Sequence, residues 1–174
     1  AKLNTTLKNF AQSDLIYTNL VKDKNISIDI IISYCDNLIK FNKEDEAISF
    51  IEKIEKNSSN DDVFQSIIGL AYFKKKQFDI AQKFLLNSIR LNNNNSFTFT
   101  LLGDCFSAVG DIENAKINYQ NSMNIDPNNK MALNNLGAIS FFSGDFIEAE
   151  KIYKLSVIKN ENNYDAMYYL AQCQ

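Results

Sequence analysis

The sequence predicts an all-α fold built from a repeated pair of helices, and three observations carry this prediction. Glycine recurs at intervals of 34 positions in one column, and alanine recurs at the same interval in another. Large apolar residues and a serine recur at the same interval, which marks a repeat architecture. Apolar residues between these columns follow the three- and four-residue spacing of amphipathic helices. The columns are Gly69, Gly103 and Gly137; Ala47, Ala81, Ala115 and Ala149; Ile51, Leu85, Tyr119 and Tyr153; and Ser88, Ser122 and Ser156.

Each repeat is expected to hold two antiparallel helices that touch through the small columns. A glycine on the first helix lets the second helix approach closely, and the alanine does the same from the other side. The segments 74–77, 92–95, 110–111 and 144–145 are poor helix interiors or favourable helix ends, so they are the predicted turns. One helix pair cannot bury its apolar face alone, so neighbouring pairs must stack.

Residues 96–129 form the most regular repeat. This unit contains Leu102-Gly103, Phe106, Gly110-Asp111, Ala115, Tyr119, Ser122 and the run Asp126-Pro127-Asn128-Asn129. With the period of 34, these residues resemble the tetratricopeptide repeat (TPR) family. The resemblance implies a right-handed superhelical solenoid of antiparallel helix pairs. It divides the chain into a partial N-terminal repeat or capping helix at 1–27, four repeats over 28–163 (28–61, 62–95, 96–129 and 130–163), and the first helix of a fifth repeat at 164–174.

Charge and motif content argue against several functions. The formal net charge is -3, from 18 basic and 21 acidic side chains, so we expect no nucleic-acid partner. Histidine is absent, and so are the GxxxxGK and GxGxxG phosphate-binding motifs. No apolar run approaches the roughly 20 residues of a membrane helix, so no membrane insertion is expected. The absence of a recognisable signal peptide and the odd cysteine count favour a cytoplasmic location.

The three cysteines are predicted to pack as small apolar residues. Cys105 and Cys173 occupy equivalent repeat positions, and Cys35 lies in the column that later carries glycine. No CxxC pair is present to hold a metal or to form a redox couple. We therefore expect no catalytic residue, no metal, no cofactor and no enzymatic activity.

The resemblance implies that the inward face of each first helix binds the ligand. Carried onto this chain, the predicted peptide-binding groove comprises Ile32, Asp36, Ile67, Leu70, Phe73, Phe97, Thr100, Leu101, Asp104, Met131, Asn134, Asn135, Phe141, Tyr168 and Tyr169, with Ala138 and Phe142 on the same face. Some of these apolar side chains are also expected to support neighbouring helices.

The composition of this groove narrows the ligand. Co-chaperones of the family clamp a C-terminal carboxylate with Lys, Asn and Arg, but the matching positions here include Asp36 and Asp104. Acids repel a carboxylate, so the clamp is predicted to be absent. Asn134 and Asn135 resemble the backbone-binding asparagines of O-linked N-acetylglucosamine transferases in one repeat only. An apolar and aromatic groove with scattered acids suits an amphipathic helix, or an extended segment with apolar anchors and a basic residue.

The sequence thus predicts a protein-protein interaction scaffold or adaptor. The alternatives are a substrate-selecting or regulatory TPR arm of a longer enzyme, or a bacterial secretion or pilus-assembly chaperone. Residues 164–174 carry Met167, Tyr168, Tyr169 and Leu170, an apolar surface with no following helix to cover it. We expect a longer parent chain, or self-association through this C-terminal end.

Overall fold

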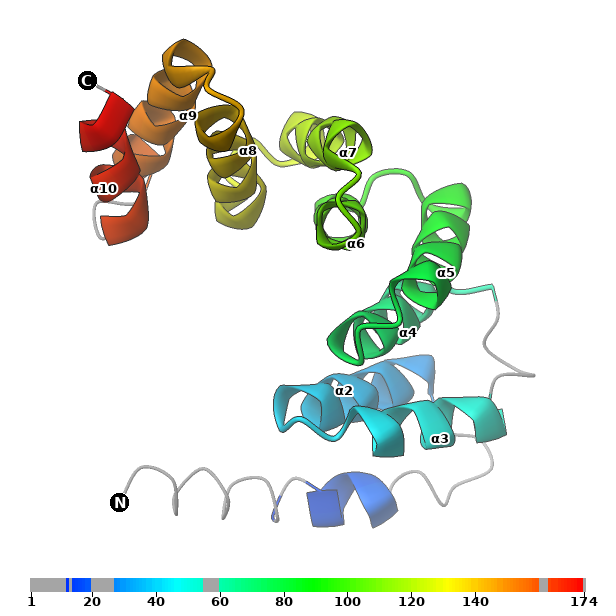
Figure 1. Cartoon of the computed structure of the whole chain (residues 1–174). Helices are drawn as coiled ribbons and strands as arrows, with labels where there is room; N and C mark the ends of the chain where they lie inside the picture. Colours follow the sequence, from blue (N-terminus) through cyan, green and yellow to red (C-terminus); the bar gives the residue numbers. More distant parts are fainter. Residues whose placement is uncertain (1–11, 13, 20–26, 55–59, 160–162, 174) are drawn as a thin grey trace. The chain divides into compact units, whose positions relative to one another are not determined.

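The computed structural model describes residues 12, 14–19, 27–54, 60–159 and 163–173, which form helices joined by short turns and contain no strand (Figure 1). The all-α prediction is confirmed. The helices are α2 (Ile28–Lys40), α3 (Glu44–Ile54), α4 (Asp62–Lys74), α5 (Phe78–Leu91), α6 (Ser96–Ala108), α7 (Ile112–Ile125), α8 (Lys130–Phe142), α9 (Phe146–Lys159) and α10 (Tyr164–Cys173). Of the predicted N-terminal element at 1–27, residues 14–19 are helical and most of the remainder lies outside the described residues.

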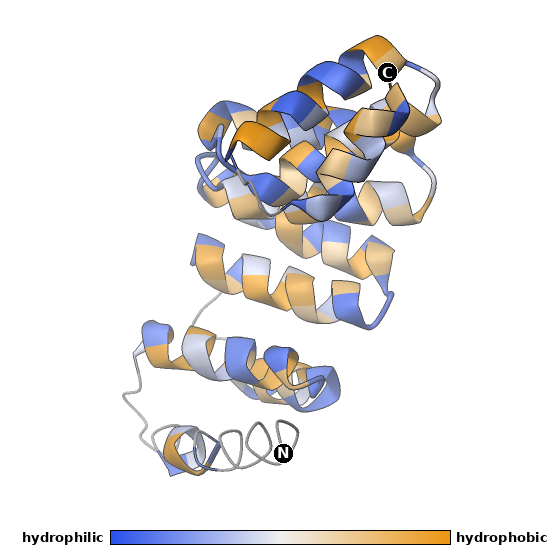
Figure 2. Cartoon of the chain, turned by 90° about the vertical axis from the view of Figure 1, so that its left-hand side faces the viewer, coloured by the Kyte–Doolittle hydropathy of each residue, from blue (hydrophilic) through white to orange (hydrophobic). Residues whose placement is uncertain are grey.

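The helices form pairs at the interval that the sequence shows. The first helices α2, α4, α6, α8 and α10 begin at Ile28, Asp62, Ser96, Lys130 and Tyr164, each 34 residues after the one before. The chain divides into two compact units, residues 1–92 and 93–174. Figure 2 shows hydrophobic and hydrophilic residues alternating along the helices, as amphipathic helices require. In the second unit, α6 packs on α7, α7 on α8, α8 on α9 and α9 on α10.

The small columns lie at the contacts between paired helices. Ala47, Ala81, Ala115 and Ala149 are fully buried. A Cβ atom added to Gly103 would lie 2.6 Å from Cε1 of Tyr119, and one on Gly137 would lie 2.8 Å from Cε1 of Tyr153. Because no side-chain carbon fits at such distances, glycine is the residue that lets each large ring lie flat against the first helix.

The turns between paired helices use one residue with a positive φ angle, again at every 34th position. Asn42 and Lys76 have φ of 58° and 59°, and Gly110 and Gly144 have φ of 82° and 84°. Glycine enters this region without the steric cost that a Cβ atom brings. The turns predicted at 74–77, 110–111 and 144–145 are therefore confirmed by the helix ends.

A polar cluster ties each repeat of the second unit to the next. Asn129 accepts hydrogen bonds from the amides of Met131 and Ala132, both at 3.1 Å, and so caps α8. Its Nδ2 donates to Oγ1 of Thr100 and to Oγ of Ser122, both at 2.9 Å. One asparagine thereby links α6, α7 and α8.

The same arrangement recurs one repeat later. Asn163 accepts from the amide of Ala166 at 3.1 Å and donates to Oδ1 of Asn134 at 2.8 Å and to Oγ of Ser156 at 2.9 Å. Ser122 and Ser156 of the serine column thus each accept a hydrogen bond from the capping asparagine of the next repeat.

Among the described residues, no helix is both long enough and apolar enough to cross a bilayer.

Candidate functional site

The candidate site is the side of residues 93–174 formed by the first helices α6, α8 and α10. Asn135 on α8 donates from Nδ2 to Oδ1 of Asp104 on α6 at 2.7 Å. Phe141 and Phe142 near the end of α8 contact Tyr169 on α10, with ring centroids 5.1 and 6.0 Å apart. Side chains therefore connect the three helices along this face, which we call the first-helix face.

Aromatic side chains gather where α8 and α10 meet, and we call Phe141, Phe142, Tyr168 and Tyr169 the aromatic patch. The ring of Phe142 is perpendicular to Phe141, at 5.5 Å, and Tyr168 contacts Tyr169 edge-on at 5.3 Å. Tyr169 also stacks on the buried Tyr153 at 5.5 Å. Phe142 is 73% exposed and Tyr168 is 62% exposed. Two rings are thus presented to solvent on a base of rings that are themselves packed.

Asp104 on α6 is held by two donors. Its Oδ1 accepts from the hydroxyl of Tyr119 and from Nδ2 of Asn135, both at 2.7 Å. Burial raises the pKa of Tyr119, and the negative charge of Asp104 raises it further, so the phenol stays protonated and keeps donating. Asp104 therefore places a fixed negative charge on the first-helix face.

The next repeat lacks this bond. Tyr153 stands 34 residues after Tyr119, but Ala138 stands where Asp104 would be repeated. The Tyr153 hydroxyl is buried and has no hydrogen-bond partner among the described residues.

We expect the two tyrosines to respond differently to removal of the hydroxyl. Tyr119→Phe should lower the free energy of unfolding by about 1–2 kcal/mol, because it breaks a hydrogen bond to a charged group. Tyr153→Phe should be neutral or stabilising, because it removes a buried hydroxyl without a bond. Urea unfolding of both variants provides the comparison. Equal losses would contradict the assignment of the Asp104 bond.

The structure brings together only part of the predicted groove in this unit. Asn134 and Asn135 are half-buried and their side chains bond within the protein, Asn134 to Ser156 and Asn163. Both asparagine side chains are thus engaged in hydrogen bonds within the protein. Of the other predicted residues, Thr100 and Leu101 are buried, and Phe97 and Met131 are exposed.

In residues 1–92, the predicted groove residues are mostly engaged in packing. Ile67 is buried, and Ile32 and Leu70 pack against the same core cluster. Asp36 pairs with Lys40 on its own helix, and Phe73 contacts Phe78 across the turn at 5.6 Å. This unit therefore offers less exposed aromatic surface from the predicted set than α8 and α10 do.

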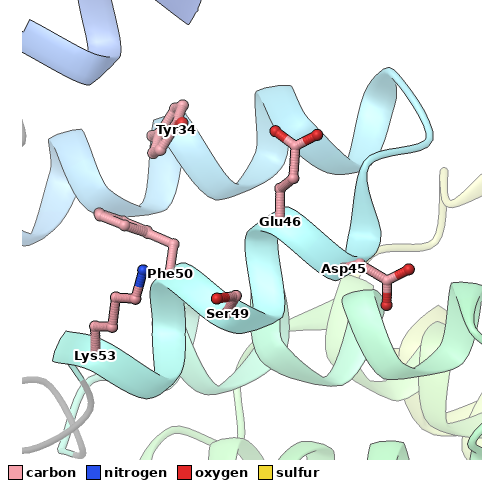
Figure 3. Close-up of a pocket in the computed structure, with 6 residues that line it drawn as sticks. All are labelled: Tyr34, Asp45, Glu46, Ser49, Phe50 and Lys53. Carbon is pink, nitrogen blue, oxygen red and sulfur yellow. The ribbon is translucent and has the colours of Figure 1, made fainter.

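An open hollow of about 370 Å³ lies between α2 and α3 (Figure 3). Its lining residues are Tyr34, Asp45, Glu46, Ser49, Phe50 and Lys53. Phe50 meets the Tyr34 ring edge-on at 5.0 Å, Asp45 pairs with Lys75, and Glu46 accepts from Lys43 at 2.7 Å. Both carboxylates are thus already paired with lysines.

Two of the three cysteines are buried, and Cys173 is partly exposed. Cys35 and Cys105 are fully buried, and burial raises the pKa of both thiols to about 12. A thiol with such a pKa stays protonated near neutral pH, and a thiol is a weak nucleophile and a poor metal ligand. Among the described residues, no three His, Cys, Asp or Glu side chains are grouped to hold a metal ion.

Comparison with known proteins identifies the repeat. Residues 66–95 and 98–129 match the family model of the tetratricopeptide repeat. The chain is 28% identical over 131 residues to the BBSome complex member BBS4 of Bos taurus, over 75% of this chain and 25% of that protein. The chain thus spans about a quarter of the length of this relative.

Solved structures show the same fold. The crystal structure of MamA superposes with a TM-score of 0.76 at 20% identity, covering 92% of this chain and 94% of MamA. YrrB, described as a TPR protein with an unusual peptide-binding site, gives 0.72 at 18% identity over 90% of this chain and 81% of YrrB. The first TPR domain of Spaghetti (RPAP3), bound to the HSP90 peptide SRMEEVD, gives 0.62 at 19% identity over 66% of this chain and 91% of that domain. Residues 66–95 and 98–129 are therefore tetratricopeptide repeats, and the described helices have the helix-pair fold of solved TPR structures.

Proposed function

We propose that this chain is a protein-interaction scaffold and that its aromatic patch binds a segment of a partner protein. The observation that carries the proposal is the pair of exposed rings, Phe142 and Tyr168, supported from behind by Phe141 and Tyr169. Isolated exposed apolar residues are common on protein surfaces, whereas a contiguous patch of this kind marks interaction sites.

The packing of the patch favours binding. Phe141 contacts Phe142, Phe146 and Tyr169, so these rings are already placed before a ligand arrives. A preorganised surface loses less side-chain entropy on association. Large aromatic side chains are also the residues that contribute most often to binding energy at interfaces.

Charge next to the patch indicates the ligand chemistry. Asp165 is exposed on α10, three residues before Tyr168 and so on the same side of the helix. Asp104 adds a second negative charge on the first-helix face. The proposed ligand is a segment with apolar anchors and a neighbouring Lys or Arg, bound as an amphipathic helix or an extended strand.

The comparisons support the class of function and not its details. YrrB and the Spaghetti domain are both described with peptide binding, and BBS4 is described as a member of a complex. A scaffold fits these descriptions. No observation on the described residues favours the two alternatives, a TPR arm of a longer enzyme or a bacterial secretion or pilus-assembly chaperone.

A peptide selection with matched variants tests the proposal. Peptides are selected from a random library on the unmodified protein, and their affinities are measured by calorimetry. The double variant Phe142→Ser, Tyr168→Ser should weaken binding by about tenfold or more, since each ring is an anchor. The control is Ile147→Ser, Ile158→Ser, which removes two α9 side chains that are 84% and 77% exposed. Equal loss in the control would contradict the assignment to the patch.

The same assay tests the prediction that the carboxylate clamp is absent. The peptide SRMEEVD ends in acidic residues and a free carboxylate, and Asp104 would repel both. We expect no measurable binding of this peptide. Low-micromolar affinity would overturn the proposed ligand chemistry.

Self-association through α10 stays a prediction. Tyr164, Met167 and Tyr168 are exposed on this helix. If a second copy covers the patch, sedimentation equilibrium will show association that rises with concentration and is weakened by Leu170→Glu. A monomer at all concentrations would contradict it.

A further inference from the structure

One repeat column changes from large side chains to a small one, and a pocket opens there. The residues at this position of successive first helices are Leu38, Tyr72, Phe106 and Ser140. Leu38 is fully buried, and Phe106 packs against the core of its unit. Ser140 brings one hydroxyl where the others bring a bulky group.

The facing column changes as well. Tyr72 stacks on Phe84 in parallel, with ring centroids 5.6 Å apart. Two repeats later the corresponding pair is Ser140 and Ile152, so both rings of the stack are missing. The volume that a ring fills in α4 and α5 is therefore not filled by these two residues of α8 and α9.

A pocket of about 220 Å³ lies at this position. It is lined by Lys116 and Gln120 from α7, Leu136 and Ser140 from α8, and Asp145, Glu148 and Ile152 from α9. Water occupies about 30 Å³ per molecule in the liquid, so the pocket is much larger than a single water site. Pockets for drug-sized ligands are about 300–1,000 Å³, so its size suits a group no larger than one side chain or a small ring.

The pocket is lined mainly by polar and charged side chains, with Leu136 and Ile152 as its apolar contacts and one buried hydroxyl. Ser140 is 2% exposed, and its Oγ has no hydrogen-bond partner among the described residues. Asp145 at the rim caps α9 through the amide of Glu148 at 3.1 Å, and Glu148 pairs with Lys151 at 3.5 Å. Asp145 and Glu148 thus have partners, while the Ser140 hydroxyl can still donate or accept a hydrogen bond. A buried hydroxyl without a hydrogen bond lowers the stability of the fold until a partner reaches it.

We propose that this pocket binds a phenolic ring, which fills the space of the missing ring and bonds through its hydroxyl to Ser140. The ring would pack on Leu136 and Ile152, and a phenol both donates and accepts. Such a group is carried by a tyrosine side chain of a partner or by a free small molecule. The site lies among α7, α8 and α9 and involves no residue of the aromatic patch, so it does not depend on the proposed peptide site.

The test uses p-cresol as the probe, followed by NMR chemical shifts and by the thermal midpoint of unfolding. Saturable shifts in α8 and α9 near Ser140, with a raised midpoint, are expected. Toluene, which lacks the hydroxyl, should bind more weakly. Ser140→Ala keeps the volume and removes the hydrogen bond, so p-cresol affinity should fall about fivefold. N-acetyl-tyrosine amide distinguishes a partner's tyrosine from a free phenol, because it binds only if a ring attached to a peptide backbone can enter the pocket.

Ser140→Phe provides the second variant. It should fill the pocket, abolish p-cresol binding and raise the thermal midpoint by filling the space. Absence of saturable shifts in the unmodified protein would overturn the proposal. The proposal would also be overturned if Ser140→Ala bound p-cresol as tightly as the unmodified protein does, and no more tightly than it binds toluene. The Phe142→Ser, Tyr168→Ser variant should bind p-cresol normally, which separates this result from the outcome at the aromatic patch.

Discussion

Gly103→Leu is expected to lower the free energy of unfolding by about 1–3 kcal/mol or more, because it overpacks a contact that has no spare volume. The first atom of the new side chain would lie 2.6 Å from Cε1 and 2.8 Å from Cδ1 of Tyr119. Tyr119 cannot swing aside cheaply, since it is 2% exposed and its hydroxyl is bonded to Asp104. The two helices must therefore separate. Urea unfolding followed by circular dichroism measures the loss.

Ala108→Leu is the matched control for this prediction. Ala108 is the last residue of the same helix and is exposed, so a larger side chain there meets no packed ring. Its effect should stay within about 0.5 kcal/mol, as for ordinary surface changes. If Gly103→Leu proved as mild as the control, the glycine column would not lie at a close helix contact.

Asn129→Ala is expected to destabilise the protein by about 2–3 kcal/mol, since it removes a helix cap and two further hydrogen bonds at once. The cap holds the amides of Met131 and Ala132 at the start of α8. The donated bonds reach Thr100 and Ser122, which are both buried. Loss of the amide leaves these hydroxyls with one partner fewer in the interior.

Asn128→Ala supplies the comparison, because Asn128 is the adjacent residue and is exposed. Its side chain accepts from Lys159 at the surface, an interaction that solvent can replace. A change below about 0.5 kcal/mol is expected for this variant. Equal destabilisation by the two variants would show that the polar cluster contributes nothing beyond a surface contact.

The repeat period predicted the helix pairs because it reports packing that every unit must satisfy. The glycine and alanine columns lie at helix contacts, where only small residues fit. The turn at 74–77 was predicted because those residues stop a helix, and α4 ends at Lys74 while α5 begins at Phe78. Such features are local or repeat with the period, so one sequence contains enough information to find them.

The exposed part of the groove could not be predicted residue by residue. A first helix packs on its own partner helix and on the next repeat, so most of its circumference is covered. Thr100 and Leu101 on α6 are buried for this reason, although the helical spacing places them near Asp104. Periodicity gives the angle of a side chain around the helix, whereas the depth to which neighbours cover it is a tertiary property.

Two features were missed although the sequence contained their signals. Asn129 and Asn163 stand 34 residues apart, which a search for repeated polar columns would have found. Ser140 interrupts a column of large residues, and a small residue in such a column is a sign of unfilled volume. Neither signal states by itself what the side chain contacts.

The most direct test of the proposed function is a chemical-shift map of the isotope-labelled protein titrated with a peptide selected on it. The proposal predicts the largest shifts around Phe142 at the end of α8 and around Tyr168 on α10, with smaller ones near Asp104. The exposed residues Ile147 and Ile158 of α9 should stay unaffected. Shifts centred on α9, with the aromatic patch unchanged, would contradict the central claim that α8 and α10 form the binding surface.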